Sequence, residues 1–245
     1  MTITTPFQTL FAVPMTCDGC VKDVSGSLRN LDGIQRVEAD LETQLLSIEG
    51  TAAPSAIVSA IQSTGRDAIL RGSGSSNSAA VAILETHADT VPDKVRGLAR
   101  MVQVAPSLTL IDLTIRGLEP GRYWATVRET GDISGGVMST GGIWTDPKEG
   151  ALRPRGIFGT VDVGRDGIGS VFIDKPVQIW EMIGRGFVVS KQHEGERKFE
   201  KNDENTLVGV IARSAGVWDN DKTVCSCSGK TLWEERKDEV QRGML

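Results

Sequence analysis

Two cysteines lie three positions apart in the stretch Met15-Thr16-Cys17-Asp18-Gly19-Cys20. A short apolar segment precedes this stretch, and apolar residues follow it at helical spacing, at Val21, Val24, Leu28 and Leu31. The cysteines therefore lie in a loop that opens a helix, where the amide groups of the helix end favour the thiolate form. Two thiolates at this spacing can both reach one metal ion, and soft thiolates select Cu(I), Zn(II) or iron–sulfur centres.

The surroundings of this cysteine pair favour one of these metals. Tetrahedral zinc needs four ligands, and no histidine or further cysteine lies nearby in the sequence. Because Cu(I) accepts a lower coordination number, we expect Cys17 and Cys20 to bind Cu(I). Two alternatives stay open: a redox-active pair of the thioredoxin type, and an incidental pair of cysteines. The first lacks the βαβ context and the aromatic–Gly–Pro centre of thioredoxins.

Residues 1–71 are predicted to form one compact domain in which strand and helix signals alternate. An apolar strand at Phe7–Val13 precedes the cysteine loop, and Pro54 fits the first turn of a second helix that ends at Gly65. The remaining strands are expected around Val37, at Leu45–Ile48 and at Ala68–Leu70. The order β-α-β-β-α-β is that of a ferredoxin-like fold.

Residues 72–78, Gly-Ser-Gly-Ser-Ser-Asn-Ser, have the composition of a linker. Residues 79–222 beyond it are predicted to be all-β, with about eight short strands and a hairpin turn at Arg165-Asp166-Gly167. The chain is therefore expected to be multidomain, with a β-sandwich or barrel as its second domain. The strands are expected at Ala79–Leu84, Leu98–Val104, Leu108–Ile115, Arg122–Arg128, Gly159–Val163, Ser170–Ile173, Gly186–Val189 and Leu207–Ile211.

A second cysteine pair, Cys225-Ser226-Cys227, lies in the polar tail 223–245. In an extended chain, residues two positions apart lie on one side, so both sulfurs point into the same space. Such a pair can bind Cu(I) transiently or exchange with another disulfide. The alternative is that two exposed cysteines have no role. The tail is too short to bury a core, and we expect a short flexible segment that orders on binding.

Composition excludes several classes of protein. The 245 residues are 39% hydrophobic and 24% charged, which is ordinary for a globular protein, and no apolar run reaches the ~18 residues of a membrane span. We expect no secretory signal and, at a net charge of −5, no general nucleic-acid binding. With only two histidines, His87 and His193, a histidine-based zinc or copper enzyme site is excluded, and we interpret both as ordinary surface residues.

Two family resemblances follow from these motifs. Residues 7–70, with the loop Met15–Cys20, resemble the heavy-metal-associated domain of copper chaperones and copper-pump ATPases, which implies that Met15 is a buried packing residue. The segment Gly121–Trp144 and the later strands resemble Cu,Zn superoxide dismutase, which implies a Greek-key barrel.

The dismutase resemblance fails at the metal ligands. It places histidines at Thr126, at Arg128, near Ile143 and at Ser190. It also places the zinc aspartate near Ile157 and the cysteine of the intrasubunit disulfide near Val137, and no histidine lies within 144–156. The resemblance therefore implies a barrel without a metal site, used for recognition of a partner, and a structural zinc is not expected.

The order of the parts, together with Trp233–Lys237, resembles the fungal members of the family of copper chaperones for superoxide dismutase. The resemblance implies a metallochaperone that receives Cu(I), with a membrane copper importer as the candidate donor, and that forms a heterodimer with immature dismutase. Cys225 and Cys227 would transfer copper and promote the target's disulfide. The implied location is the cytoplasm, with a fraction in the mitochondrial intermembrane space, and membrane contact would be transient. The alternative is a thiol oxidoreductase with incidental copper binding.

Four residues are candidates for the docking surface: Trp180, Arg185, Arg213 and Trp218. Tryptophan and arginine are enriched at binding hot spots, whereas the plainer interpretation is of core tryptophans and surface arginines. The resemblance implies that the docking surface includes Gly209–Trp218 and is the one through which dismutases dimerise. A homodimer of this chain would then use the same surface.

Overall fold

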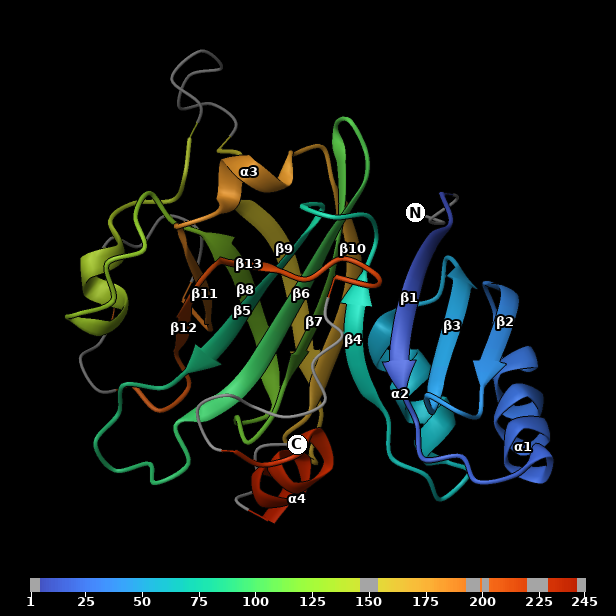
Figure 1. Cartoon of the computed structure of the whole chain (residues 1–245). Helices are drawn as coiled ribbons and strands as arrows, with labels where there is room; N and C mark the ends of the chain where they lie inside the picture. The colour runs from blue at the N-terminus through green and yellow to red at the C-terminus, as the bar shows by residue number, and fades with distance from the viewer. Residues whose placement is uncertain (1–4, 146–153, 193–198, 200–202, 220–228, 242–245) are drawn as a thin grey trace. The chain divides into compact units, whose positions relative to one another are not determined.

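A computed structural model describes residues 5–145, 154–192, 199, 203–219 and 229–241 (Figure 1). They form two compact units. The first unit comprises Met1–Ala79, Val102–Pro106 and Ser214–Lys237, and the second unit comprises Ala80–Met101, Ser107–Arg213 and Asp238–Leu245. No helix within the described ranges is both long enough and apolar enough to cross a membrane.

The first unit has the predicted β-α-β-β-α-β order. It contains β1 (Phe7–Ala12), α1 (Asp18–Arg29), β2 (Ile34–Asp40), β3 (Leu45–Gly50), α2 (Pro54–Gln62) and β4 (Ile69–Ser73). The antiparallel sheet has the order β2-β3-β1-β4, so the first strand of the chain lies between the last two. Both helices pack on one face of it, because Val24, Leu28, Ile57 and Ile61 share a core with the buried strand residues Phe11, Leu46 and Ile48. The ferredoxin-like prediction is confirmed.

The second unit has the predicted all-β architecture, with a sheet in the order β10-β7-β6-β5-β12-β11-β8-β9. The late strand β12 lies between β5 and β11, which is a Greek-key arrangement. Its core contains the fully buried rings of Tyr123, Phe158 and Phe187. The strands are β5 (Ala79–Glu85), β6 (Val95–Ala105), β7 (Leu108–Ile115), β8 (Gly121–Val127), β9 (Ile157–Val163), β10 (Gly169–Lys175), β11 (Gly186–Ser190), β12 (Leu207–Val210) and β13 (Ala212–Ser214), with the short helices η1 (Gly136–Thr140) and α3 (Ile179–Met182) between them.

The predicted linker 72–78 needs a correction. Gly72 and Ser73 belong to β4, where they pair with Leu10 and Thr9 of β1. The glycine serves close packing rather than flexibility, because a Cβ at Gly72 would lie 2.1 Å from the carbonyl oxygen of Gly216. Only residues beyond Ser73 connect the predicted domains.

The predicted boundary at residue 222 also shifts, because Ser214–Lys237 belongs to the first unit. The backbone amide of Val217 donates a hydrogen bond to the carbonyl of Gly74 at 2.8 Å. We assigned no element to the tail, but the structure contains a helix there, α4 (Leu232–Gln241). Periodicity did not reveal this helix, since its sequence is charged on most sides and has no apolar stripe.

Candidate functional site

The cysteine loop places both thiols at the amino-terminal end of α1. Cys17 is the cap residue, with extended backbone angles, and Cys20 is the third residue of the helix. The two sulfur atoms lie 3.5 Å apart, both cysteines are free, and Cys17 is exposed while Cys20 is partly exposed. The pair can therefore offer two sulfur ligands to one soft ion that approaches from solvent.

The electrostatics of the loop favour a thiolate at Cys20. Hydrogen bonds from the backbone of Thr16, from the Arg66 guanidinium, and from the side chains of Cys17 and Thr16 lower the pKa of Cys20 to about 6. The same contact with Cys20 raises the pKa of Arg66. Arg66 also donates to the carboxylate of Asp23 at 3.3 Å. A thiolate at neutral pH is the form that binds metal and attacks disulfides.

Sequence reasoning missed Arg66. It lies in the segment between α2 and β4, 46 positions after Cys20, and only the ferredoxin-like topology brings it to the cysteine loop. A single arginine carries no periodic or spacing signal, so the sequence alone does not distinguish it from other surface arginines.

Met15 has the buried role that the family resemblance implied. Its side chain is 1% exposed and packs in the core of the first unit, with Val24, Leu28 and Ile57. The residue therefore supports the loop from behind, while Cys17 and Cys20 stay at the surface.

Other predicted metal residues lie elsewhere or outside the described residues. Cys225, Cys227 and His193 are not among the described residues. His87 is exposed, and it lies against the backbone of Gly136. Within the described residues there is no group of three or more histidine, cysteine or acidic side chains that could hold a metal ion.

Three of the positions at which the dismutase resemblance places copper ligands, Thr126, Arg128 and Ser190, are buried. Arg128 is only 4% exposed, and its Nη2 atom donates to the carbonyl of Gly141 at 2.7 Å. Its guanidinium lies 5.1 Å from the ring centre of Phe199, and burial lowers the pKa of Arg128. The hydroxyl of Thr126 donates to the carbonyl of Val188 at 3.5 Å. A guanidinium cannot bind a metal cation, so these residues do not form a copper site.

The remaining ligand positions are equally unsuited to metal. Ser190 is buried and hydrogen-bonds the hydroxyl of Thr206 at 3.3 Å. Ile143 forms an isolated bridge with Arg128, and Ile157 begins β9. Val137 is buried in η1 and packs with Val188 and Val208. These side chains offer no metal ligand.

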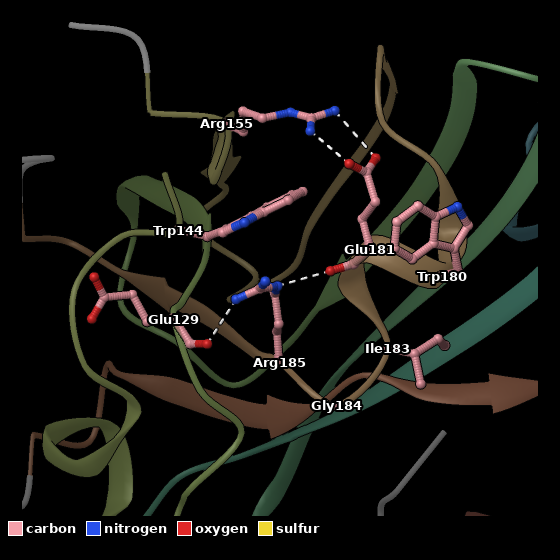
Figure 2. Close-up of a pocket in the computed structure, with 8 residues that line it drawn as sticks. All are labelled: Glu129, Trp144, Arg155, Trp180, Glu181, Ile183, Gly184 and Arg185. Atoms are coloured by element: carbon pink, nitrogen blue, oxygen red, sulfur yellow. Dashed lines mark hydrogen bonds and ion pairs between the residues drawn. The ribbon is translucent and has the colours of Figure 1, made fainter. Parts of the chain in front are cut away.

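A pocket on the second unit brings together two of the four predicted docking residues, Trp180 and Arg185 (Figure 2). Trp180 is 65% exposed, although tryptophan is usually well buried, and its indole N–H donates to Gln178 at 2.7 Å. Arg185 donates to the backbone carbonyls of Glu129 and Glu181, at 2.7 and 2.8 Å. The pocket lining is Glu129, Trp144, Arg155, Trp180, Glu181, Ile183, Gly184 and Arg185.

The pocket is held rigid by residues that sequence reasoning missed. Trp144 lies between two guanidinium groups, with Arg155 at 5.0 Å and Arg185 at 4.8 Å from its ring (Figure 2). Arg155 also forms a two-point ion pair with Glu181, at 2.6 and 3.1 Å. A signal for Glu181 existed, because Gln178 and Glu181 have the spacing of a capping box and form one at the start of α3.

The structure does not bring the other two predicted docking residues into this pocket. Arg213 is exposed on β13, and Trp218, which is 61% exposed with a φ of 69°, belongs to the first unit. A positive φ is rare for a bulky residue, and here it occurs in the turn after the Val217–Gly74 contact.

Comparisons with known proteins give one family match in the first unit and several relatives that match nearly the whole chain. The heavy-metal-associated domain family matches residues 9–67. The "Superoxide dismutase 1 copper chaperone" of Saccharomyces cerevisiae is 44% identical, over 97% of each chain, and that of Kluyveromyces lactis is 45% identical, over 97% of this chain and 96% of its own. The human "Copper chaperone for superoxide dismutase" is 36% identical, over 92% of this chain and 88% of its own.

Proposed function

The chain belongs to the family of copper chaperones for superoxide dismutase, and from that premise we propose that it carries copper as Cu(I) on Cys17 and Cys20 and delivers it to immature Cu,Zn superoxide dismutase. It is a metallochaperone and not a dismutase. The observation that carries the proposal is the pair of free thiols 3.5 Å apart at the surface of the heavy-metal-associated domain. Two sulfur ligands suit the low coordination number of Cu(I).

Docking on the target is proposed to use the second unit in a heterodimer. The pocket around Trp180 and Arg185 offers an exposed aromatic anchor beside a fixed guanidinium, which is the residue chemistry of binding hot spots. Arg213, on the second unit, and Trp218, which belongs to the first unit, stay predicted docking residues. A homodimer through this surface is proposed for the chain without its target.

The release step is proposed to use Cys225 and Cys227. A disulfide on this pair would exchange with two thiols of the dismutase, which become the dismutase disulfide while the pair is reduced to two thiols. An external oxidant, for which molecular oxygen is the simplest choice, must then reoxidise the pair. A membrane copper importer is the proposed donor, and the cytoplasm and the mitochondrial intermembrane space are the proposed locations.

A second candidate function is thiol oxidoreduction with incidental copper binding. The low pKa of Cys20, about 6, favours it, because such thiolates also serve disulfide exchange. The two functions differ in what Cys17 and Cys20 contribute. A pure oxidoreductase forms the dismutase disulfide at the same rate at any copper level, whereas a chaperone delivers no copper once Cys17 and Cys20 are changed to serine.

The deciding experiment mixes the reduced, copper-loaded protein with apo dismutase in air-saturated buffer, where oxygen is the oxidant, and counts subunits, copper ions and disulfides by native mass spectrometry. We expect a one-to-one complex, then copper and a new disulfide on the dismutase. Trp180→Ala should weaken the complex roughly thirtyfold, as truncation of a central anchor costs ~2 kcal/mol. Ile168→Ala, at an exposed hydrophobic residue outside the pocket, is the matched control. Absence of copper transfer by the wild type would refute the chaperone function.

A further inference from the structure

The carboxyl-terminal helix α4 makes a specific contact with the domain that carries Cys17 and Cys20. The Nε and Nη2 atoms of Arg236 donate to both carboxylate oxygens of Asp67, at 2.7 and 2.9 Å. The two side chains are only 12% and 33% exposed. A two-point arginine–carboxylate pair with this burial is stronger and more specific than an ordinary surface ion pair.

Asp67 is built to receive this contact. Its carboxylate also accepts hydrogen bonds from Gln62, at the end of α2, and from the backbone amide of Ala68. Burial alone would raise the pKa of Asp67, but the hydrogen bonds from Arg236, Ala68 and Gln62 outweigh it, so the pKa is below its usual value. The carboxylate is therefore oriented by hydrogen bonds from its own domain, and the pair with Arg236 favours its charged form.

Residues at the start of α4 form a capping box that favours the helix, but α4 is too short to be stable alone. Thr231 and Glu234 form a reciprocal capping box: the amide of Glu234 donates to the Thr231 hydroxyl, and the amide of Thr231 donates to the Glu234 carboxylate. An isolated helix of 10 residues is marginal in water. Tertiary contact must supply the rest, through Arg236 and the partly buried Leu232 and Trp233.

A second contact fixes the start of the same carboxyl-terminal segment on the first unit. The amide of Ser73 donates to the carbonyl of Ala215, and Ser76 hydrogen-bonds the carboxylate of Asp219. The chain from Ser214 to Lys237 is thus attached to the first unit at both of its ends, near β4 and at Asp67. The contact at Asp67 is made by side chains, whereas the contacts near β4 include the backbone hydrogen bond from Ser73 to Ala215, so the contact at Asp67 can be released while that backbone bond stays intact.

We propose that α4 is an intramolecular ligand of the copper-binding domain, held at Asp67 by Arg236, and that its release frees the carboxyl-terminal segment for a partner. The second half of this proposal rests on the proposed function, since the partner is the dismutase. While Arg236 is paired with Asp67, α4 is held on the unit that carries Cys17 and Cys20. Asp67 directly follows Arg66, which contacts Cys20, so the residue that holds α4 is the sequence neighbour of the residue that stabilises the Cys20 thiolate.

Hydrogen–deuterium exchange of the full chain, without copper or dismutase, tests the docking. Arg236→Glu should speed amide exchange roughly fivefold in two peptides together, 62–68 and 231–241, because the charge reversal removes a two-point ion pair. Lys237→Glu makes the same charge change at the next, exposed position of the helix and should leave both peptides unchanged. Faster exchange of 231–241 alone, or equal effects of the two variants, would overturn the docking site.

A charge exchange guards against a variant that merely unfolds α4. Asp67→Lys combined with Arg236→Glu should restore protection in both peptides, whereas Asp67→Lys alone should not. Failure of the double variant to restore either peptide would refute the pairing.

Addition of apo dismutase to the wild type tests the release, with native mass spectrometry reporting the fraction in complex. Exchange in 62–68 and 231–241 should rise toward the Arg236→Glu level in proportion to the complex formed. If a complex with the dismutase forms and both peptides stay protected, the release of α4 does not accompany dismutase binding, and that half of the proposal is wrong. If no complex forms, the proposed function and the release step fail together, while the docking result stands by itself.

Discussion

Two regions of this chain correspond to metal sites in the families that they resemble, and they differ in how their polar atoms are placed. At the cysteine loop, two sulfur atoms lie 3.5 Å apart at the surface, and a nearby arginine stabilises negative charge on one of them. At the former ligand positions of the barrel, a guanidinium is buried against a carbonyl and an aromatic ring. The first region leaves its ligand atoms available, and the second uses its polar atoms internally.

A charge beside a site affects whether a metal cation can bind there, as the ligand atoms themselves do. Arg66 sits beside a thiol and lowers its pKa, so it supports cation binding indirectly by favouring the thiolate. Arg128 stands at a ligand position, and its positive charge repels a cation. The same residue type therefore maintains one metal site and blocks the other.

Removal of a sulfur ligand should strongly reduce copper binding. Introduction of a histidine at one of the barrel positions should leave copper binding unchanged. Cys17→Ser or Cys20→Ser should reduce Cu(I) affinity by more than the ~10–100-fold that follows loss of an outer-shell partner, because a direct ligand is lost. Arg128→His should create no copper site in the barrel, since Thr126 and Ser190 stay hydrogen-bonded to their neighbours. Competition against a Cu(I) chelator measures the Cu(I) affinity of the cysteine variants and of Arg128→His. A gain of copper binding by Arg128→His would contradict the difference drawn between the two regions.

Met15→Ala should destabilise the copper-binding domain by about 2–5 kcal/mol, because a fully buried side chain leaves a cavity. Thermal unfolding followed by peptide-resolved hydrogen exchange reports each unit separately. The barrel peptides should keep their wild-type protection. Met138→Ala removes a side chain that is 50% exposed and serves as the control. Equal effects of the two variants would mean that Met15 does not support the loop.

Arg128→Ala should destabilise the barrel by ~1–3 kcal/mol, since the carbonyl of Gly141 loses its donor and the stacked side chain is lost. Arg122→Ala breaks an exposed ion pair with Asp162 and should have a much smaller effect. Chemical denaturation of the second unit, followed by hydrogen exchange, measures the difference. An unchanged or more stable Arg128→Ala barrel would show that the guanidinium fills space without stabilising the fold.

Arg66→Ala should have the smallest effect and should act on chemistry rather than on stability. Cys20 has a pKa of about 6, so its thiolate predominates above that pH and its alkylation rate rises through pH 6. Loss of the Arg66 hydrogen bond should move this rise to higher pH and slow alkylation at pH 6.5 by roughly a few-fold. Arg36→Ala, which breaks an exposed ion pair on β2, is the control, and peptide mass spectrometry reads out the alkylated residue.

Local signals in the sequence predicted most of the fold. The apolar spacing of Val24 and Leu28 located α1, and Asp166-Gly167 located a hairpin turn at which Gly167 has a φ of 76°. The strand alternation of Leu108–Ile115 gave β7 with its observed bounds. These features could be predicted because each depends on residues a few positions apart.

Contacts between distant parts of the sequence could not be predicted. Arg66 and Cys20 are 46 positions apart, Arg236 and Asp67 are 169 apart, and no periodicity links either pair. The pocket shows the same limit: Trp180 and Arg185 were candidates by residue type, but Trp144 and Arg155 were found only in the folded barrel.

The close approach of Gly72 to Gly216 has a practical consequence for dissecting this chain. A fragment cut after residue 71 would end within β4 and remove the partners of Thr9 and Leu10 in the middle of β1. The exposed backbone would be an unpaired strand edge, which is a known route to aggregation. Anyone who expresses the copper-binding domain alone should therefore keep the chain through Ala79, and any fused tag or inserted spacer should be placed beyond Gly74.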